Sequence, residues 1–144
     1  MGLGHVLGDG QAQPGPNRIA RIAAPLKPLR QGCDLGLGKA DAVVCDVTST
    51  EAVDALIAET VASAGRLDVV VNNAGLGGQT PLVEMTDHEW DRVLNVTLTS
   101  VMRATRAALR YFRDVPHGGG IVNNASVLGW LAQHSQSHYA AAKA

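Results

Sequence analysis

The amino-acid sequence predicts an α/β fold in which short parallel strands alternate with helices. The β-branched run at 69–71 and the apolar residues at 120–122 have the length and composition of strands. Between them, residues 87–112 carry apolar residues at helical rather than strand spacing, and a second helix is expected at 49–64. Because strands that alternate with such helices form βαβ units, we expect a parallel sheet.

The first 38 residues are predicted to be atypical and irregular. Proline at this density disfavours a buried strand or a regular helix, and the early glycines follow no predicted strand; these residues are Pro14, Pro16, Pro25 and Pro28, and Gly2, Gly4 and Gly8. The pattern becomes regular near residue 39. We therefore divide the chain into a Pro/Gly-rich segment at 1–38 and a partial domain at 39–144, in which residues 41–46 are a predicted strand.

Two capping boxes mark the starts of the predicted helices. Thr48, with Glu51 three residues later, precedes the helix at 49–64, and Thr86, with Glu89, precedes the helix at 87–112. The apolar face of the longer helix consists of Trp90, Leu94, Leu98, Val101, Met102, Leu109 and Phe112. From residue 41 the expected order is thus β-α-β-α-β, followed by the start of another helix.

Polar residues follow both of the later strands. Asn-Asn-Ala-Gly stands at 72–75, and Asn-Asn-Ala-Ser stands at 123–126, which delivers Ser126 to the carboxyl end of its strand. In open α/β sheets, ligands bind at this edge. The sequence therefore predicts a binding site formed by these two segments.

A tyrosine and a lysine near the C-terminal end are spaced for acid–base chemistry. Tyr139 and Lys143 lie four positions apart in an Ala-rich stretch, so a helix would project both side chains from one face. A nearby cation favours the phenolate and lowers the pKa of tyrosine from its usual value of about 10. Such a pair can act as a general acid or base.

Composition excludes several other classes of protein. The chain has 144 residues, 46% apolar content and a net charge of −1, which is ordinary for one globular domain in the cytoplasm. No basic patch indicates nucleic acid, and no apolar run approaches the roughly 20 residues of a membrane span. Cys33 and Cys45 do not form a disulfide pattern. His134 and His138 lie four apart without a third ligand nearby, so no metal site is predicted.

Together, these motifs resemble the short branch of the short-chain dehydrogenase/reductase family. The resemblance rests on Asn-Asn-Ala-Gly at 72–75, Asn95, Ser126 and the pair Tyr139 and Lys143, in that order, and covers about residues 41 to 144. It implies a partial Rossmann-like, doubly wound parallel sheet in three α/β/α layers. With the strand order 3-2-1-4-5-6, the strand ending at Asp46 would be the third and would have no neighbour among the predicted strands.

The resemblance also implies a reaction, the interconversion of a secondary alcohol and a ketone with NAD or NADP. Tyr139 would exchange a proton with the substrate oxygen, and Ser126 would hydrogen-bond the same oxygen. Lys143 would lower the tyrosine pKa and bind the nicotinamide ribose, while Asn95 would hold a water that links Lys143 to solvent. The residues implied in cofactor binding are Asp46, Val47, Asn73, Ala74, Gly75, Tyr139 and Lys143.

Four of these residues also have ordinary structural interpretations. Asn95 can be a plain helix residue, and Ser126 can cap the turn that follows it. The side chain of Asn73 can bridge neighbouring strands. Asp46, two residues before Thr48, can serve a turn instead of contacting an adenine ring.

The expected substrate is a small apolar ketone or alcohol. Residues 127–138 would line the pocket, and Leu128, Trp130 and Leu131 favour an apolar ligand. The stretch is similar to actinobacterial members associated with acyl-thioester or steroid breakdown. Family members are commonly homo-oligomers joined through their long helices, here 87–112. The residue that distinguishes NAD from NADP follows the second strand, which the sequence does not visibly encode.

The chain is expected to be a partial member that lacks the N-terminal Gly-rich nucleotide turn and the C-terminal portion. We hypothesise that residues 1–38 are translated in a foreign frame. The alternative function is therefore a catalytically silent fragment, or a docking partner of a full-length homologue. On this interpretation the isolated chain would be partly unfolded and would show no dehydrogenase activity.

Overall fold

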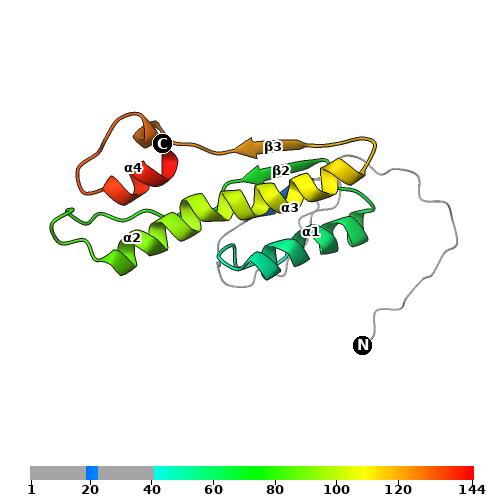
Figure 1. Ribbon diagram of the computed structural model, residues 1–144, viewed down its shortest axis with the longest axis horizontal. Coiled ribbons are helices and arrows are strands. Elements are labelled where there is room, and N and C mark those ends of the chain that lie inside the picture. The colour runs from blue at the N-terminus through cyan, green and yellow to red at the C-terminus, as the bar shows by residue number, and fades with distance from the viewer. Residues whose placement is uncertain (1–18, 23–40) are drawn as a thin grey trace, which may run out of the picture.

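A computed structural model describes residues 19–22 and 41–144 of the chain. The elements in order are β1 (Ile19–Ile22), α1 (Thr50–Ala64), β2 (Val69–Asn72), α2 (Asp87–Leu94), η1 (Asn95–Thr99), α3 (Ser100–Asp114), β3 (Gly120–Asn123), η2 (Val127–Gly129) and α4 (Ser137–Lys143). Figure 1 shows α2, η1 and α3 as one long helical stretch that runs beside β2 and β3. Among the described residues, no helix is long and apolar enough to cross a membrane.

The three strands form one parallel sheet in the order β1-β2-β3. Val69 pairs with Ile19 on one side and with Gly120 on the other, and Asn72 pairs with Asn123. The predicted parallel α/β arrangement is therefore confirmed. The carboxyl ends of β2 and β3 point toward the end of the molecule where α4 and the start of α2 lie (Figure 1).

Residues 41–46 do not form the predicted strand. They have no regular secondary structure, and Val43 and Val44 are 42% and 72% exposed. Among residues 41–46, only the side chain of Cys45 is buried in the core. A strand needs a neighbour for its N–H and C=O groups, and among the described residues β1, β2 and β3 pair with one another and not with this segment. The expected unpaired third strand is thus not observed.

β1 lies within the segment at 1–38 that was expected to be irregular. Its four residues, Ile19–Ile22, pair in parallel with β2. The other residues of the segment, 1–18 and 23–38, lie outside the described residues, so the expectation stays untested there. At these four positions, pairing with a formed neighbouring strand overrides the unfavourable local composition.

Capping determines where the two predicted helices begin. Thr86 caps α2 as expected, because its hydroxyl accepts a hydrogen bond from the N–H of Glu89 at 3.2 Å. At α1 the cap is Ser49, not Thr48, and its hydroxyl accepts from Ala52 N–H at 3.1 Å. Thr48 instead donates to Asp46. Gly65 ends α1 in the left-handed region, with a φ of 79° that glycine adopts without strain.

The helical stretch predicted at 87–112 is interrupted by a π-helix. Asn95–Thr99 have π-type hydrogen bonding, and Ser100 N–H reaches Asn95 O. A π-bulge rotates the side chains that follow it relative to a regular helix, and such bulges often occur at functional sites. The bulge begins at Asn95, a predicted site residue.

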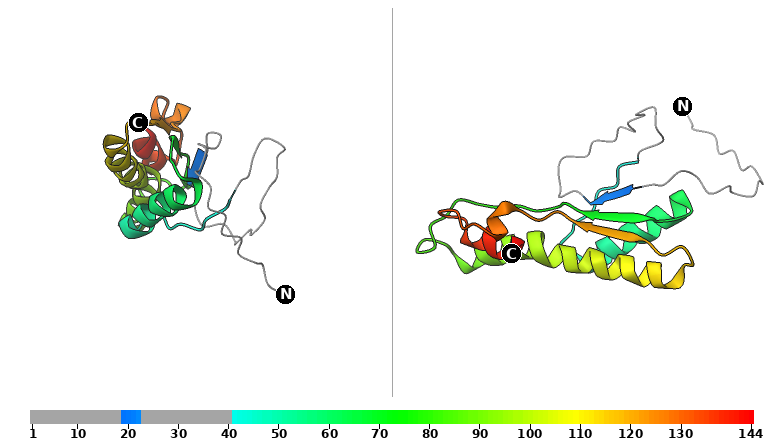
Figure 2. Two further views of the ribbon diagram at one scale, coloured as in Figure 1. Left: turned by 90° about the vertical axis from the view of Figure 1, so that its right-hand side faces the viewer. Right: turned by 90° about the horizontal axis from the view of Figure 1, so that it is seen from above.

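The core lies between the sheet and one layer of helices. Helices α1 and α3 pack side by side, and α3 contacts β2 and β3 (Figures 1 and 2). Buried apolar side chains from α1, β2, α3 and the segment before α1 fill this layer: Cys45, Val47, Val53, Leu56, Ile57, Leu67, Val70, Ala104, Ala107, Ala108 and Phe112. On β3, Ile121 packs against this core, whereas Val122 on the opposite face is 52% exposed. The part of the chain that is described thus covers one face of the sheet.

Candidate active site

Helix α4 brings Tyr139 and Lys143 to one face. Both side chains are half-buried, and Lys143 Nζ lies 5.9 Å from the centre of the Tyr139 ring. The helical pairing inferred from their spacing is therefore present. The amine therefore stands beside the tyrosine ring.

The segment after β3 also binds Lys143. Its Nζ donates a hydrogen bond to the carbonyl of Asn124 at 2.7 Å. Partial burial lowers the pKa of Lys143, because desolvation disfavours the ammonium form. Nζ also lies 3.8 Å from the point where a Cβ on Gly75 would stand. The amine is thus next to the Asn-Asn-Ala-Gly turn that follows β2.

Paired asparagines join the carboxyl ends of β2 and β3. Asn72 is buried, and its Nδ2 donates to Asn123 Oδ1 at 2.8 Å and to Thr105 Oγ1 at 3.2 Å. One residue on, Asn124 Nδ2 donates to Asn73 Oδ1 at 2.7 Å. Asn73 therefore does bridge the ends of neighbouring strands. These bonds fix the position of the Asn124 carbonyl that binds Lys143.

Ser126 lies at the start of η2. Its hydroxyl accepts a hydrogen bond from Leu128 N–H at 3.2 Å, so it caps the turn. η2 packs against α4, and Gly129 approaches so closely that a side chain there would collide with the Lys143 carbonyl. The capping interpretation of Ser126 is correct, and its donor hydrogen remains available for another acceptor because the capping bond uses only a lone pair.

Asn95 and Thr97 belong to the π-helix, which packs against α4. Asn95 is half-buried. Thr97 is buried and makes two hydrogen bonds to Leu76, accepting from its N–H at 3.0 Å and donating to its carbonyl at 2.8 Å. The bulge thereby anchors the glycine-containing loop after Gly75.

A hollow of about 470 Å³ opens beside Tyr139. It is lined by Gly75, Leu76, Gly77, Gly78, Gln79, Gln136 and Tyr139. A Cβ on Gly77 would stand 3.2 Å from Tyr139 Cδ2, and one on Gly75 would stand 3.4 Å from Thr97 Cγ2. The two glycines therefore let the loop pack closely against Tyr139 and Thr97 at the edge of the hollow.

Asp46 and Val47 are not joined to Tyr139 or Lys143 by any contact between described residues. Asp46 accepts hydrogen bonds from Thr48 N–H at 2.9 Å and from Thr48 Oγ1 at 2.7 Å. These bonds lower the pKa of Asp46. The side chain of Val47 is buried in the core. The turn interpretation of Asp46 is thus observed, and contact of these two residues with a cofactor stays a prediction, as it does for Ala74, which is buried next to Gly75.

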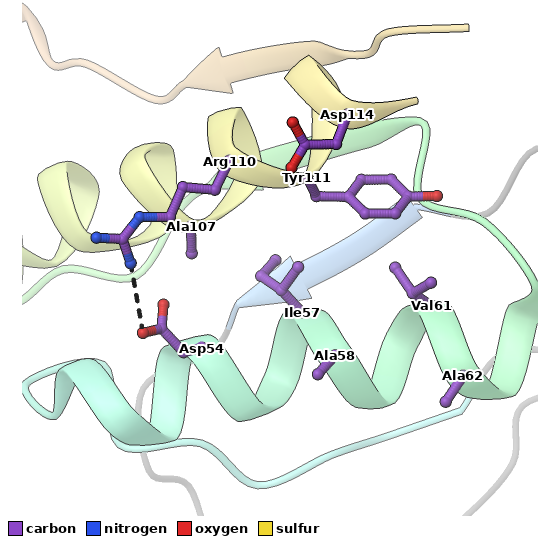
Figure 3. A pocket seen from close by; sticks show the side chains of 9 residues that line it. All are labelled: Asp54, Ile57, Ala58, Val61, Ala62, Ala107, Arg110, Tyr111 and Asp114. Carbon is purple, nitrogen blue, oxygen red and sulfur yellow. Dashed lines mark ion pairs between the residues drawn. The ribbon is translucent and has the colours of Figure 1, made fainter. Parts of the chain in front are cut away.

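A second groove, of about 530 Å³, lies between α1 and α3 (Figure 3). Its floor is apolar, and across it Asp54 and Arg110 form an ion pair at 3.8 Å. Tyr111 and Asp114 lie at the end of α3 that is remote from α4 (Figures 1 and 3). None of the predicted site residues lines this groove.

Sequence reasoning missed the residues that support the pair on α4. The Asn124 carbonyl, Thr97 and a contact between His138 and Glu89 were not predicted. The sequence did contain a signal for the position of Asn124. Asn-Asn-Ala occurs at the end of both strands, and pairing of the two strands brings these repeats side by side. His134 is exposed, whereas His138 is fully buried. Among the described residues, no group of three potential metal ligands is found.

Comparison with known proteins gives consistent matches. The family model for short chain dehydrogenase matches residues 1–144, including the segment at 1–38 that sequence pattern left outside the resemblance. A curated relative from Mycobacterium tuberculosis, (5R,7aS)-5-hydroxy-7a-methyl-1-oxo-2,3,5,6,7,7a-hexahydro-1H-indene-carboxyl-CoA reductase, is 80% identical over 127 residues, covering 88% of this chain and 46% of the relative.

Two further matches agree. 3beta-hydroxysteroid dehydrogenase 2 of Eggerthella lenta is 40% identical over 106 residues, covering 73% of this chain and 41% of the relative. A crystal structure of a short chain dehydrogenase from Mycobacterium smegmatis is 86% identical, with a TM-score of 0.75, over 76% of this chain and 46% of that one. The chain spans about half the length of these relatives. By its matched motifs, its parallel sheet and these comparisons, the chain belongs to the short-chain dehydrogenase family.

Proposed function

We propose that this chain carries the proton-transfer residues of an NAD(P)-dependent oxidoreductase that interconverts a secondary alcohol and a ketone. The observation that carries the proposal is the arrangement of Tyr139 and Lys143 on α4. Both face the carboxyl ends of β2 and β3, and the hollow lined by Gly75 and Gly77 lies next to the tyrosine ring. Ligands bind at this edge of open α/β sheets.

The residues present fit a nicotinamide dinucleotide. Gly75 and Gly77 line the hollow, and Lys143 Nζ is close enough to donate to hydroxyl groups that enter beside Gly75. Lys143 and the turn at 73–75 would therefore hold the nicotinamide ribose. When bound, this group supplies or accepts the hydride. The choice between NAD and NADP is left open.

The chain's own residues manage the proton. Tyr139 would donate its phenolic proton to the carbonyl oxygen during reduction and take it back during oxidation. Ser126 would donate its hydroxyl hydrogen to the same oxygen, since its capping bond leaves this donor free. Lys143 would place its ammonium beside the phenol, and Asn95 would hold a water that passes protons to solvent.

For the substrate, we propose an apolar, fused-ring or acyl-thioester ketone. The segment after Ser126 exposes three large apolar side chains, with Val127, Trp130 and Leu131 at 65%, 89% and 66% exposure. A cluster of this kind is typical of a ligand or partner surface. The names of two relatives, a coenzyme A-linked indene reductase and a hydroxysteroid dehydrogenase, support the same class.

The test uses a complete polypeptide. Residues 41–144 of this chain would replace the aligned segment of the 80%-identical relative, and we call the product the grafted reductase. We expect oxidation of NADH or NADPH, followed by absorbance, that depends on an added ring ketone. The 144-residue chain would be assayed beside it, together with a thermal melt and calorimetry against both cofactors.

The outcomes separate the two functions considered. Ketone-dependent turnover by the grafted reductase supports the proposed activity for this sequence. A folded graft that binds cofactor but turns over no ketone contradicts it. If the graft is active and the 144-residue chain binds no cofactor at millimolar concentration, the chain by itself is a silent fragment or a docking partner.

Ser126→Ala should lower kcat of the grafted reductase by roughly 10²-fold or more, because it removes a donor aimed at the oxygen on which charge develops. Cofactor KM should change little. Ser137→Ala is the matched control, because its hydroxyl lies on α4 but has no hydrogen-bond partner among the described residues. Full activity of Ser126→Ala would show that the residue only caps η2.

A further inference from the structure

His138 stands directly before Tyr139 and is the most completely buried polar side chain of α4. Its exposed fraction is 0%, and neither Nδ1 nor Nε2 has a hydrogen-bond partner among the described residues. Buried polar groups are normally hydrogen-bonded, and each exception asks for an explanation. The imidazole thus occupies a position that an apolar ring could fill without leaving a buried polar group unpaired.

A carboxylate on another helix lies next to the imidazole. Glu89 Oε1, from the first turn of α2, lies 3.4 Å from His138 Nε2. Glu89 is 24% exposed, and the same oxygen accepts a hydrogen bond from Thr80 Oγ1 at 2.8 Å. A small rotation of either side chain would complete a charge-assisted bond between α2 and α4.

The loop that forms the hollow closes over this pair. A Cβ on Gly78 would stand 2.9 Å from both Glu89 Oε1 and His138 Nε2, so only glycine fits between loop and pair. Thr80 is tied to the segment before α4, because its N–H donates to the Ser135 carbonyl at 2.9 Å. The carboxylate, the imidazole and the loop at 76–80 thus form one contact beside Tyr139.

We propose that Glu89 and His138 are a positioning pair that sets where the Tyr139 phenol stands in the site. The proposal rests on the proposed function, since it assigns the pair a role in that reaction. Tyr139 follows His138 in the same turn, so a shift of the imidazole moves the phenol. Lys143, at the other end of α4, is held independently by the Asn124 carbonyl. Loss of the pair therefore displaces Tyr139 more than Lys143.

Four substitutions in the grafted reductase test the pair. His138→Phe keeps the ring and removes both nitrogens, whereas His138→Gln keeps one N–H donor near the position of Nε2. Glu89→Met removes the carboxylate at similar length, and Glu89→Gln keeps an oxygen acceptor. A displacement of about 1 Å costs up to roughly 10²-fold in rate. We expect His138→Phe and Glu89→Met to lower kcat by about tenfold or more, with cofactor KM nearly unchanged.

Coupling and rescue distinguish positioning from mere support. The double variant of His138→Phe and Glu89→Met should be no slower than the slower single variant, because both remove one interaction. His138→Gln should recover most of kcat. Unchanged kcat in His138→Phe, additive losses, or a Gln variant as slow as the Phe variant would each overturn the proposal. Glu84→Gln and His88→Gln, at exposed positions near Glu89, serve as controls.

A readout without turnover keeps the inference separate from the proposed function. In ¹⁵N NMR spectra of the grafted reductase, the His138 ring nitrogens should shift on Glu89→Gln and stay unchanged on Glu84→Gln. In ¹³C spectra of the same samples, the Tyr139 ring signals should shift as well. If the graft has no activity but these shifts appear, the proposed function fails while the pairing stands. If the graft is active and His138 does not respond to Glu89→Gln, the pairing itself is wrong.

Discussion

Tyr139→Phe is expected to abolish measurable turnover in the grafted reductase. The substitution removes the phenolic proton, and a positioned general acid contributes about 10²- to 10⁴-fold to a rate. The phenyl ring still packs against the backbone at Gly77, which lies in contact with the ring and not with the hydroxyl. Cofactor affinity measured by calorimetry should therefore stay close to that of the unsubstituted protein.

Tyr111→Phe is the matched control for this prediction. Tyr111 lies near the end of α3 in the groove of Figure 3, packed edge-on against Phe112 with ring centres 5.9 Å apart. Its hydroxyl is remote from the hollow beside α4, so its loss should leave kcat unchanged. Substantial ketone reduction by the Tyr139→Phe variant would show that another group donates the proton.

Lys143→Ala is expected to lower both kcat and cofactor affinity. The substitution removes the cation next to the Tyr139 ring and the hydrogen bond from Nζ to the Asn124 carbonyl, 2.7 Å long. A fixed charge or donor at the reacting centre contributes roughly 10²- to 10³-fold, so kcat/KM should fall by at least that factor. The pH profile should also change, because the ammonium beside the phenol is gone.

Two further variants make the result specific. Lys143→Met keeps the apolar part of the side chain, so an equal loss in Met and Ala variants assigns the effect to the amine and not to packing. Arg106→Ala removes an exposed cation from α3 and should leave both parameters unchanged. A Lys143→Ala variant that loses kcat but keeps full cofactor affinity would remove the proposed ribose contact and leave only the effect on Tyr139.

Local sequence signals predicted most of the regular structure from residue 47 on. The starts of α1 and α2, the strands β2 and β3, and the helix that carries Tyr139 and Lys143 all follow from caps and periodicity. The N-cap of α1 was assigned to the wrong one of two neighbouring residues. Thr48 and Ser49 both offer a hydroxyl, and the cap falls to Ser49 because Thr48 binds Asp46.

The strand predicted at 41–46 failed for a reason that no local pattern contains. An apolar, β-branched segment becomes a strand only if a neighbour accepts its backbone hydrogen bonds. Among the described residues, the sheet consists of β1, β2 and β3, and none of them pairs with 41–46. The π-helix at Asn95–Thr99 is similarly invisible in sequence, because one extra residue in a turn barely changes the apolar period.

For the candidate site, the sequence by itself determined the chemical groups and the i, i+4 relation of Tyr139 and Lys143, because helical geometry depends only on neighbours along the chain. Only the tertiary structure decided what surrounds them. The Asn124 carbonyl that binds Lys143, the paired asparagines of β2 and β3, and the buried contact of His138 with Glu89 join segments far apart in the chain. Such contacts depend on strand register and helix packing, which the pattern of any single segment does not contain.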